Sequence, residues 1–306
     1  MALLEVRGLV KTFGLTRAVN GLSFDVHPGE VFGIVGPDGA GKSTLARLLV
    51  GLLDPDTGDI TAADVDIRTQ ADKAREHIGY MPQQYSLYGD LTVAENLRFF
   101  ADMFFVEESE RNSRMERLYQ FSRLGPFSDR RADRLSGGMY KKLALMCSMI
   151  HKPRLLILDE PTTGVDPLSR RELWEIIYTM VEEEKVGIVV NTPYMDEAER
   201  CHRVGMMWEG NFLAIDSPAD ILGRHPEKIF EIQSDDRDAV LEKLKDNKHI
   251  TRCYGVGQAV RAAFASDASR EEAVLQLYSA GIPEEAVQEV SPSFDDVFMV
   301  FKEAGR

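Results

Sequence analysis

Short apolar runs alternate with helical patterns along most of this chain. Three of the runs are almost continuously apolar, over residues 31–35, 155–158 and 186–190. Continuous apolar strands are buried on both faces, as in parallel sheets. Helical patterns lie between such runs, for example over residues 169–180. This alternation predicts an α/β fold built on a mostly parallel sheet.

The N-terminal part of the chain shows a different pattern. Residues 3–7 and 22–26 are predicted to be short strands, with residues 12–14 in the turn between them. Residues 54–59 are rich in Asp, Pro and Gly and are predicted to form a turn. We assign all of these segments to a first domain that covers residues 1–222.

A helical subdomain is predicted within that domain, over about residues 90–150. Thr92 and Glu95 have the spacing of a capping box and open a helix. The apolar face of this helix consists of Val93, Leu97, Phe100 and Phe104. Phe99 and Phe105 lie off that face, so they are either additional core residues or part of a docking surface.

From about residue 228 the pattern changes to that of a small α+β domain. Strand, helix, two strands, helix and strand follow one another, and a final helix is predicted over residues 294–301. This order of elements is that of a ferredoxin-like domain. Residues 228–306 show no catalytic constellation, so we interpret them as a regulatory or dimer-supporting domain.

A glycine-rich segment joins the first apolar strand to a helix. It matches the pattern G-x-x-x-x-G-K-[ST], and it consists of Gly36, Pro37, Asp38, Gly39, Ala40, Gly41, Lys42, Ser43 and Thr44. Glycines let backbone N–H groups turn toward phosphate oxygens, and the helix start adds the positive end of its dipole. Lys42 would place a charge on the β- and γ-phosphates, and the Ser43 hydroxyl would bind Mg²⁺.

Three more polar residues follow predicted strands. Asp159 and Glu160 end the second apolar run, at the carboxyl end of a strand, where function is located in such sheets. Asp159 could bind Mg²⁺ directly or position another ligand of the metal, and Glu160 is placed to polarise a water. The Gln83 amide oxygen could bind a metal or an attacking water, or it could be a solvated loop amide.

Two further segments have both a functional and a structural interpretation. Phe13 could stack on an adenine ring, or it could be a core or turn aromatic. Ser136, Gly137 and Gly138 immediately precede a helical pattern. They form either a second anion site or a flexible turn with an N-cap. The residues alone leave both pairs of alternatives open.

The composition restricts the class of partner and the compartment. The formal net charge is −14, which argues against nonspecific binding to nucleic acid. The three cysteines, Cys147, Cys201 and Cys253, have neither disulfide nor metal spacing, so we expect a reducing cytosol. No apolar run approaches the roughly 20 residues that span a bilayer, and the start has no signal-peptide pattern. We therefore expect a soluble protein, with docking on a membrane partner left open.

The motifs, in this order, resemble those of the nucleotide-binding subunit of an ABC transporter. The resemblance covers about residues 3–222 and rests on the glycine-rich loop, Gln83, Leu135 to Gly138, Asp159-Glu160 and Asp166. More closely, the chain resembles the exporter ATPases that serve ABC-2 permeases, including drug-efflux systems. That closer likeness is carried by Met139, Val165-Asp166-Pro167 and the segments 194–199 and 292–298.

The resemblance implies an ATP site shared by two subunits. Lys42 and the loop amides would hold the phosphates, and Phe13 would stack on adenine. Ser136, Gly137 and Gly138 would cap the γ-phosphate of the ATP bound by the opposite protomer. Members of the family work as head-to-tail dimers with two ATP molecules at the interface.

The resemblance also implies a metal site and a general base. Ser43 and Gln83 would contact Mg²⁺, and Asp159 would fix the metal. Glu160 would act as the general base on water. Cycles of closure on ATP and opening after hydrolysis would drive an integral membrane permease.

The same resemblance implies a location, and a group of aromatic residues suggests a docking site. We expect the protein in the cytoplasm, peripheral to the inner face of the cell membrane. A coupling helix of the permease would dock on a face formed by Tyr85, Leu87, Tyr88, Phe99 and Phe100.

Pro193 departs from the family pattern, which has a histidine at this position. That histidine contacts the γ-phosphate and helps to position Glu160 and water, whereas proline offers neither a side-chain donor nor a backbone N–H. Two alternatives to an active export ATPase remain open, and the first of them follows from Pro193. One is an ATP-binding regulatory subunit that hydrolyses poorly and pairs with a second, complete ATPase. The other is a soluble ABC ATPase of repair or assembly, which the acidic charge disfavours.

Overall fold

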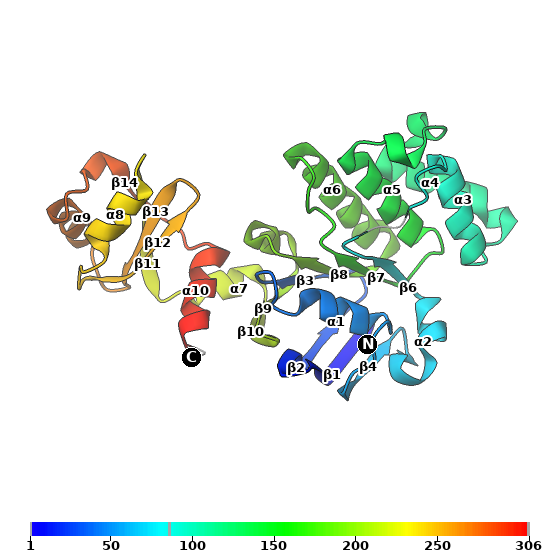
Figure 1. Ribbon diagram of the computed structural model, residues 1–306, viewed down its shortest axis with the longest axis horizontal. Coiled ribbons are helices and arrows are strands. Elements are labelled where there is room, and N and C mark those ends of the chain that lie inside the picture. Colours follow the sequence, from blue (N-terminus) through cyan, green and yellow to red (C-terminus); the bar gives the residue numbers. More distant parts are fainter. Residues whose placement is uncertain (1, 85–86, 305–306) are drawn as a thin grey trace. The chain divides into compact units, whose positions relative to one another are not determined.

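The computed structural model describes residues 2–84 and 87–304. These residues form two units that divide after Pro218 (Figure 1). The division lies a few residues before the expected end of the first domain at residue 222. None of the helices in the described part of the chain has the length and hydropathy of a membrane span.

A six-stranded sheet forms the centre of the first unit. Its strand order is β10-β9-β3-β8-β7-β6, and all neighbours are parallel except β9 and β10. The strands are β3 (Val31–Val35), β6 (Ile78–Met81), β7 (Leu155–Asp159), β8 (Gly187–Thr192), β9 (Arg203–Trp208) and β10 (Asn211–Asp216). Every residue of β3, β7 and β8 is buried. The prediction of a mostly parallel α/β sheet is confirmed.

The register of this sheet brings the ends of three strands together. Val35 of β3 pairs with Thr192 of β8, and Asp159 of β7 pairs with Asn191 of β8. The glycine-rich loop leaves β3 directly after Val35. The loop, the Asp159 carboxylate and the turn after Thr192 therefore start from one edge of the sheet, as expected for a site at the carboxyl ends of parallel strands.

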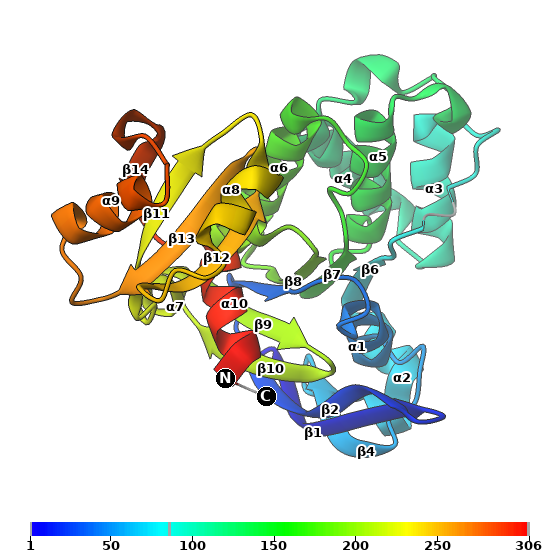
Figure 2. The ribbon, with the colours of Figure 1, turned by 60° about the vertical axis from the view of Figure 1, so that its left-hand side comes forward.

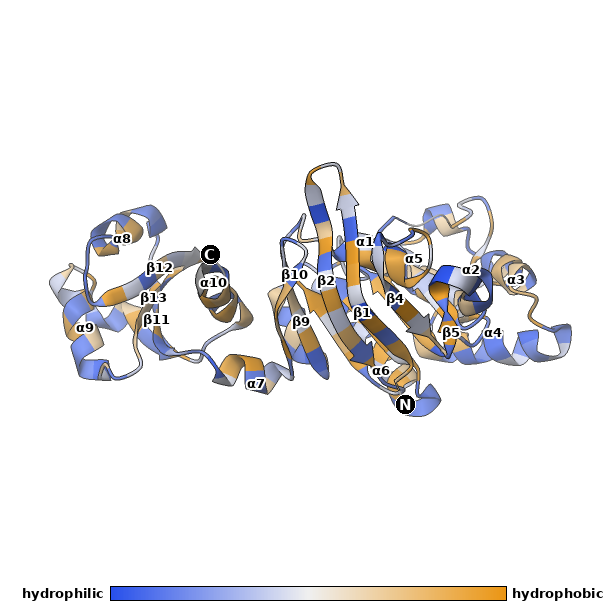
Figure 3. Cartoon of the chain, turned by 90° about the horizontal axis from the view of Figure 1, so that it is seen from below, coloured by the Kyte–Doolittle hydropathy of each residue, from blue (hydrophilic) through white to orange (hydrophobic). Residues whose placement is uncertain are grey.

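A second sheet contains the strands β1 (Leu4–Phe13), β2 (Thr16–Val26), β4 (Thr57–Ala62) and β5 (Val65–Asp66), all antiparallel to their neighbours. Hydrophobic and hydrophilic residues alternate along β1 and β2 (Figure 3). Both strands are longer than the predicted segments 3–7 and 22–26. The turn between them lies at Gly14 and Leu15 rather than at residues 12–14, because pairing extends the ladder to Phe13 and Thr16.

The predicted turn over residues 54–59 is wrong from Thr57 onward, where β4 begins. Val6 of β1 pairs with Ile60 of β4, so β4 belongs to the sheet. Gly58 has a φ of +91°, and the register between β1 and β4 shifts beside it. A local irregularity therefore absorbs the turn-forming residues, and pairing between distant segments overrides the local preference.

Helices lie between and beside the sheets. Helix α1 (Lys42–Leu49) lies between the two sheets, and one apolar core joins it to both (Figures 1 and 2). Helix α2 (Ile67–Arg75), which the sequence patterns did not predict, packs on β4 and β5. A layer of four helices packs on the other side: α3 (Val93–Met103), α4 (Glu108–Ser122), α5 (Gly137–Met149) and α6 (Pro167–Glu184). The capping box of Thr92 and Glu95 at the start of α3 is confirmed.

The second unit contains a four-stranded antiparallel sheet in the order β12-β13-β11-β14. Its elements are α7 (Pro218–Gly223), β11 (Glu227–Gln233), α8 (Arg237–Leu244), β12 (Ile250–Val256), β13 (Ala259–Ala265), α9 (Arg270–Ser279), β14 (Val287–Val290) and α10 (Phe294–Ala304). The predicted sequence of strand, helix, two strands, helix, strand and final helix is present. Helices α8 and α9 pack on the sheet through a separate apolar core that includes Phe230, Phe264 and Leu277.

Candidate nucleotide-binding site

The glycine-rich loop lines a cavity of about 690 Å³ at the carboxyl edge of the six-stranded sheet. The lining residues are Leu15, Thr16, Arg17, Ala18, Asp38, Gly39, Gly41, Lys42, Ser43, Thr44, Gln83, Glu160, Glu209 and Gly210. Gly41 has a φ of +109°, and a Cβ atom there would lie 2.0 Å from the Ala18 carbonyl oxygen. A Cβ on Gly36 would lie 2.2 Å from the Met207 carbonyl oxygen. The loop therefore needs glycine at both positions to pass close to neighbouring backbone.

The Lys42 side chain is buried inside this loop. Its Nζ donates hydrogen bonds to the carbonyl oxygens of Gly36 at 2.8 Å and Pro37 at 2.9 Å. Burial lowers the pKa of the ammonium, and the charges of Glu160, Asp38 and Asp159 act in the opposite direction. The loop thus holds a cation at the start of α1, beside the backbone N–H groups that a helix start presents to an anion.

Asp159 lies at the centre of a small hydrogen-bond network. Its Oδ1 accepts from Ser43 Oγ at 3.1 Å and from Asn191 Nδ2 at 3.2 Å. The Asn191 amide also donates to the Lys42 carbonyl oxygen at 2.8 Å, so it ties β8 to the first turn of α1. Burial raises the pKa of Asp159, while the hydrogen bonds from Asn191 and Ser43 lower it. Asn191 was not predicted, because a polar residue at the end of an apolar run does not reveal what it faces.

Glu160 follows Asp159 in a strained backbone conformation and lines the cavity. Its φ is +53°, in the left-handed region, and its N–H donates to the Asn191 carbonyl oxygen at 2.9 Å. Glu160 Oε2 accepts from Gln83 Nε2 at 2.9 Å and from Thr163 Oγ1 at 3.1 Å. The structure therefore fixes the direction of a carboxylate that faces the cavity. Thr163 is a second residue that sequence reasoning missed.

Oxygen atoms suited to Mg²⁺ meet at the same place. The Ser43 hydroxyl and the Asp159 carboxylate are in hydrogen-bond contact. Gln83 lines the same cavity as Ser43, and its amide nitrogen donates to Glu160. Hydroxyl, carboxylate and amide oxygens are the ligand types that Mg²⁺ prefers. The donor set at these three positions therefore fits the metal.

Phe13 does not enter the cavity. It ends β1, is 50% exposed, and is not among the described residues that line the cavity. The Lys11 ammonium lies 5.7 Å from the centre of its ring. The residues that follow, 15–18, line the cavity in its place. An exposed ring at its margin is available for stacking, and the role of Phe13 stays a prediction.

Ser136, Gly137 and Gly138 lie at the start of α5, and none of them is among the described residues lining the cavity. Ser136 Oγ accepts a hydrogen bond from the Met139 N–H at 3.3 Å, so Ser136 is an N-cap. Asp166 caps α6 in the same way and accepts from Ser169 N–H at 3.0 Å. Within one chain these residues lie at helix starts. They could contact ATP only if that ATP were bound in the cavity of a second chain.

Pro193 directly follows β8 at the carboxyl edge of the sheet. Its neighbour Thr192 pairs with Val35, the last residue before the glycine-rich loop. Beyond Pro193, the Arg170 guanidinium lies 4.3 Å from the centre of the Tyr194 ring. The position of β8 between β3 and β7 therefore places residue 193 between the loop and the Asp159-Glu160 pair along the sheet edge.

The chain is similar in sequence to known proteins over most of its length. The family model of ABC transporters matches residues 19–163. The chain is 38% identical, over 302 residues, to the probable multidrug ABC transporter ATP-binding protein YbhF of Escherichia coli (strain K12), with 97% of this chain and 52% of that protein covered. It is 36% identical, over 299 residues, to the Nod factor export ATP-binding protein I of Rhizobium sp. (strain N33), with 97% and 95% covered. The chain thus spans about half the length of the first relative and nearly all of the second.

Solved structures show the same fold. An ATP-binding subunit of an ABC transporter superposes with a TM-score of 0.66 at 30% identity, covering 72% of this chain and 92% of that one. The protein cbiO1 of Clostridium perfringens, part of the ABC transporter complex cbiONQ, superposes with a TM-score of 0.68 at 29% identity, covering 73% and 91%.

Proposed function

Because the chain belongs to the ABC transporter family of ATP-binding proteins, we propose that it binds MgATP and hydrolyses it to power an ABC-2-type exporter. The observation that carries this proposal is the convergence of Lys42, Ser43, Gln83 and Glu160 at one cavity, with Asp159 hydrogen-bonded to Ser43. Relatives that are named as multidrug and Nod factor export ATP-binding proteins support export as the process.

The residues at the cavity have different roles in the proposed hydrolysis. Lys42 and the loop N–H groups would bind the phosphates, and Ser43, Gln83 and Asp159 would hold Mg²⁺. Bound Mg²⁺ would neutralise charge on the phosphate oxygens. Glu160, oriented by its two hydrogen bonds, accepts a proton from the attacking water as general base. Phe13 stacks on the adenine.

A second chain completes the site in this proposal. Ser136, Gly137 and Gly138 meet the γ-phosphate held by the opposite protomer, which explains why they lie away from the cavity of their own chain. Asp166 lies near this surface at the start of α6. The opposite protomer is a second copy or a related ATPase subunit.

A permease docks on the helical layer through Tyr88 and its neighbours. Tyr88 and Phe99 are 46% and 38% exposed, and their ring centres are 4.5 Å apart. The buried Asn96 side chain accepts from the Tyr88 N–H and donates to its carbonyl oxygen, both at 3.0 Å, which holds this stretch of backbone. Rigid exposed aromatics are typical anchors of protein interfaces. Tyr85, predicted for the same face, lies outside the described residues.

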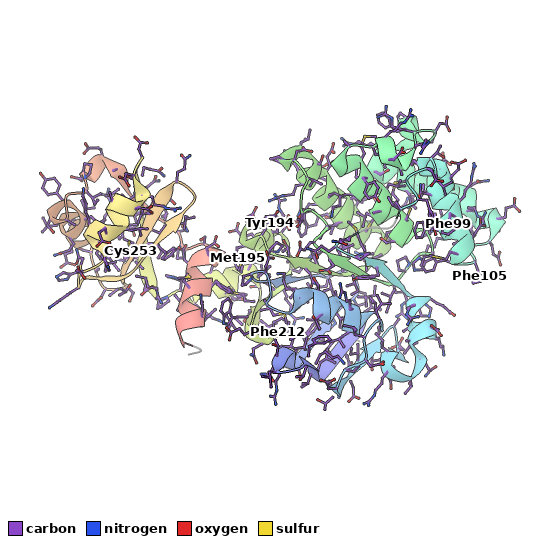
Figure 4. All side chains as sticks on the ribbon, viewed as in Figure 1. Phe99, Phe105, Tyr194, Met195, Phe212 and Cys253 are labelled. Carbon is purple, nitrogen blue, oxygen red and sulfur yellow. The ribbon has the colours of Figure 1, made fainter. Side chains whose placement is uncertain are left out.

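A mostly apolar cavity of about 310 Å³ adjoins this aromatic pair. Its lining residues are Val50, Leu52, Arg75, Ile78, Tyr80, Pro82, Leu87, Phe100, Met103, Phe104, Ala144, Cys147 and Ser148. Phe105, 90% exposed, lies at the same end of the helical layer as Phe99 (Figure 4). A short helix of a permease at the inner face of the cell membrane is the occupant we propose.

The second unit is a ferredoxin-like domain with a regulatory or dimer-supporting role in this proposal. The strand order β12-β13-β11-β14 and the two helices on the sheet support the ferredoxin-like assignment. The described residues that line the ATP cavity all belong to the first unit.

A regulatory subunit that binds ATP and hydrolyses it poorly is the second candidate function. The observation in its favour is Pro193, which supplies no donor at the edge between the loop and Glu160. Such a subunit would pair with a second ATPase that hydrolyses ATP. A soluble ATPase of repair is disfavoured by the net charge of −14.

Glu160→Gln tests the proposed function, because the amide keeps the shape of the side chain and removes the base. We expect phosphate release to fall by about 10²-fold or more, and ATP-bound dimer to accumulate in size-exclusion chromatography with MgATP. Glu182→Gln, an exposed change on α6, is the control and should leave both unchanged. Negligible phosphate release by both the wild-type and the Glu160→Gln proteins, with ATP bound to both, would refute hydrolysis and favour the regulatory subunit.

A further inference from the structure

Glu197 is a buried carboxylate to which the ATP site assigns no role. It lies on the short 3₁₀ helix Met195–Arg200, and its side chain has no exposed surface. Its Oε1 accepts from Thr162 Oγ1 at 2.7 Å and from Trp174 Nε1 at 3.3 Å. Its Oε2 accepts from Thr192 Oγ1 at 2.7 Å. One carboxylate therefore joins three separate parts of the chain.

Two of these parts carry the residues that surround the reacting centre. Thr162 stands in the loop after β7, next to Thr163, whose hydroxyl donates to Glu160 at 3.1 Å. Thr192 ends β8 and immediately precedes Pro193. The third part is α6, through Trp174. The Glu197 carboxylate thus connects the loop that orients Glu160 to the strand end that carries residue 193.

The charge of Glu197 is compensated inside the protein. Three hydrogen bonds reach its oxygens, and Arg170 Nε lies 3.8 Å from Oε1. This Arg170 Nε is buried and has no hydrogen-bond partner among the described residues. A buried carboxylate is costly unless it is paired and hydrogen-bonded. Glu197 meets both conditions, so it is held in one geometry.

We propose that Glu197 is a positioning residue for ATP hydrolysis. It fixes the distance between the loop that carries Thr162 and Thr163 and the end of β8. Glu160 then keeps its direction toward the attack site, although Pro193 offers it no hydrogen bond. This inference rests on the proposed function, because it assigns Glu197 to the reaction that Glu160 performs.

Glu197→Gln is the test, with Glu199→Gln as the matched control on the same short helix. The amide keeps the size of the side chain and loses the charge and one of the two acceptor oxygens. Small displacements of a catalytic group cost up to about 10²-fold in rate. We therefore expect kcat to fall between about tenfold and 10²-fold, with the KM for MgATP within about twofold of wild type. The exposed Glu199 should tolerate its change.

The Glu160→Gln background separates positioning from stability. If Glu197 acts through Glu160, adding Glu197→Gln to Glu160→Gln should change the residual rate by less than about twofold, because residues that act as one unit are not additive. An equal fall of kcat in both backgrounds would overturn the proposal and leave Glu197 a structural residue. Thr162→Val, which removes one donor only, should shift kcat in the same direction and serves if Glu197→Gln fails to fold.

Amide hydrogen exchange supplies a readout that needs no hydrolysis. In the nucleotide-free protein, Glu197→Gln should speed exchange in residues 161–164 and 192–196 together, because both segments lose the same anchor. Unchanged exchange in either segment would overturn the proposal. Failure of the proposed function is distinguishable, because it would appear as negligible phosphate release by the wild-type protein as well as by Glu160→Gln.

Discussion

Replacing Pro193 with histidine tests whether the carboxyl edge of the sheet lacks a hydrogen-bond donor for the γ-phosphate. Residue 193 follows Thr192, which pairs with the last residue before the glycine-rich loop, and Asn191 pairs with Asp159. A donor on residue 193 would start from the strand between the phosphate loop and the Asp159-Glu160 pair. Proline supplies no such donor from its side chain or its backbone.

The substitution has two effects, a gain in the rate of hydrolysis and a loss of folding stability. Restoring one donor to developing charge on the γ-phosphate is worth roughly 10²–10³ in rate, or about 2.7–4 kcal/mol. Replacing proline costs roughly 0.4–1 kcal/mol of stability, because the unfolded chain gains freedom. The Thr192 hydroxyl would still donate to Glu197 at 2.7 Å and accept from the Tyr194 N–H at 3.1 Å, so other contacts hold the turn. We therefore expect a net rise in turnover without loss of the fold.

The assay is steady-state phosphate release at saturating MgATP from wild type, Pro193→His and Pro193→Ala. The alanine variant removes the ring and adds no donor, so it isolates the effect of relaxing the turn. We expect slow release by wild type alone, little change with alanine, and a gain of roughly 10²-fold with histidine. An equal gain with alanine would assign the effect to the ring. Brisk release by wild type with no gain from histidine would show that another group does this work.

Three further predictions concern the loop, the docking face and acid stability. Lys42→Ala should weaken ATP binding by roughly 10–10²-fold, because a charged hydrogen bond is worth about 1.5–3 kcal/mol; unchanged affinity in a titration would refute the loop assignment. Tyr88→Glu should abolish capture of the permease without changing ATP affinity. The control Tyr278→Glu on α9 should leave capture of the permease unchanged. Loss of folding in Tyr88→Glu would mean that Tyr88 is a core residue. Burial lowers the pKa of His151 to about 4, from an ordinary 6.5, so the unfolded state takes up the proton first and stability falls as pH drops through that interval. Urea unfolding should show about 2 kcal/mol less stability at pH 5 than at pH 7 from this group, and His151→Gln should remove that part of the difference.

The sequence was most informative where chemistry and topology are local. The apolar runs ending at Val35 and Asp159 predicted buried parallel strands, and the carboxyl ends of such strands meet at one edge by construction. Ser43 and Asp159 were therefore expected together, and they lie 3.1 Å apart. The order of the elements in the second unit was also predicted, because strand and helix patterns are local.

What the sequence did not reveal depends on contacts between distant segments. Strand β4 begins in a run of turn residues because it pairs with β1, which no local pattern encodes. Asn191 directly follows an apolar run and contacts Asp159 only because β7 and β8 are neighbours. The charged segment around Glu197 would suggest a surface residue. Glu197 is nevertheless buried and accepts hydrogen bonds from Thr162 and Thr192. The residues that orient a site are thus harder to predict than those that carry its chemistry.

The electrostatics of the site explain why a nucleotide and a metal would bind to it together. Lys42 donates to two loop carbonyls, and the charges of Glu160, Asp38 and Asp159 all act on it. A triphosphate brings further negative charge beside these carboxylates. Charges at short range in a buried site interact strongly. A divalent cation at Ser43 and Asp159 would therefore offset the repulsion between the phosphates and the carboxylates, which Lys42 would otherwise have to offset alone. The same carboxylates that disfavour free ATP would then favour MgATP, which is the form that places a metal beside the base Glu160.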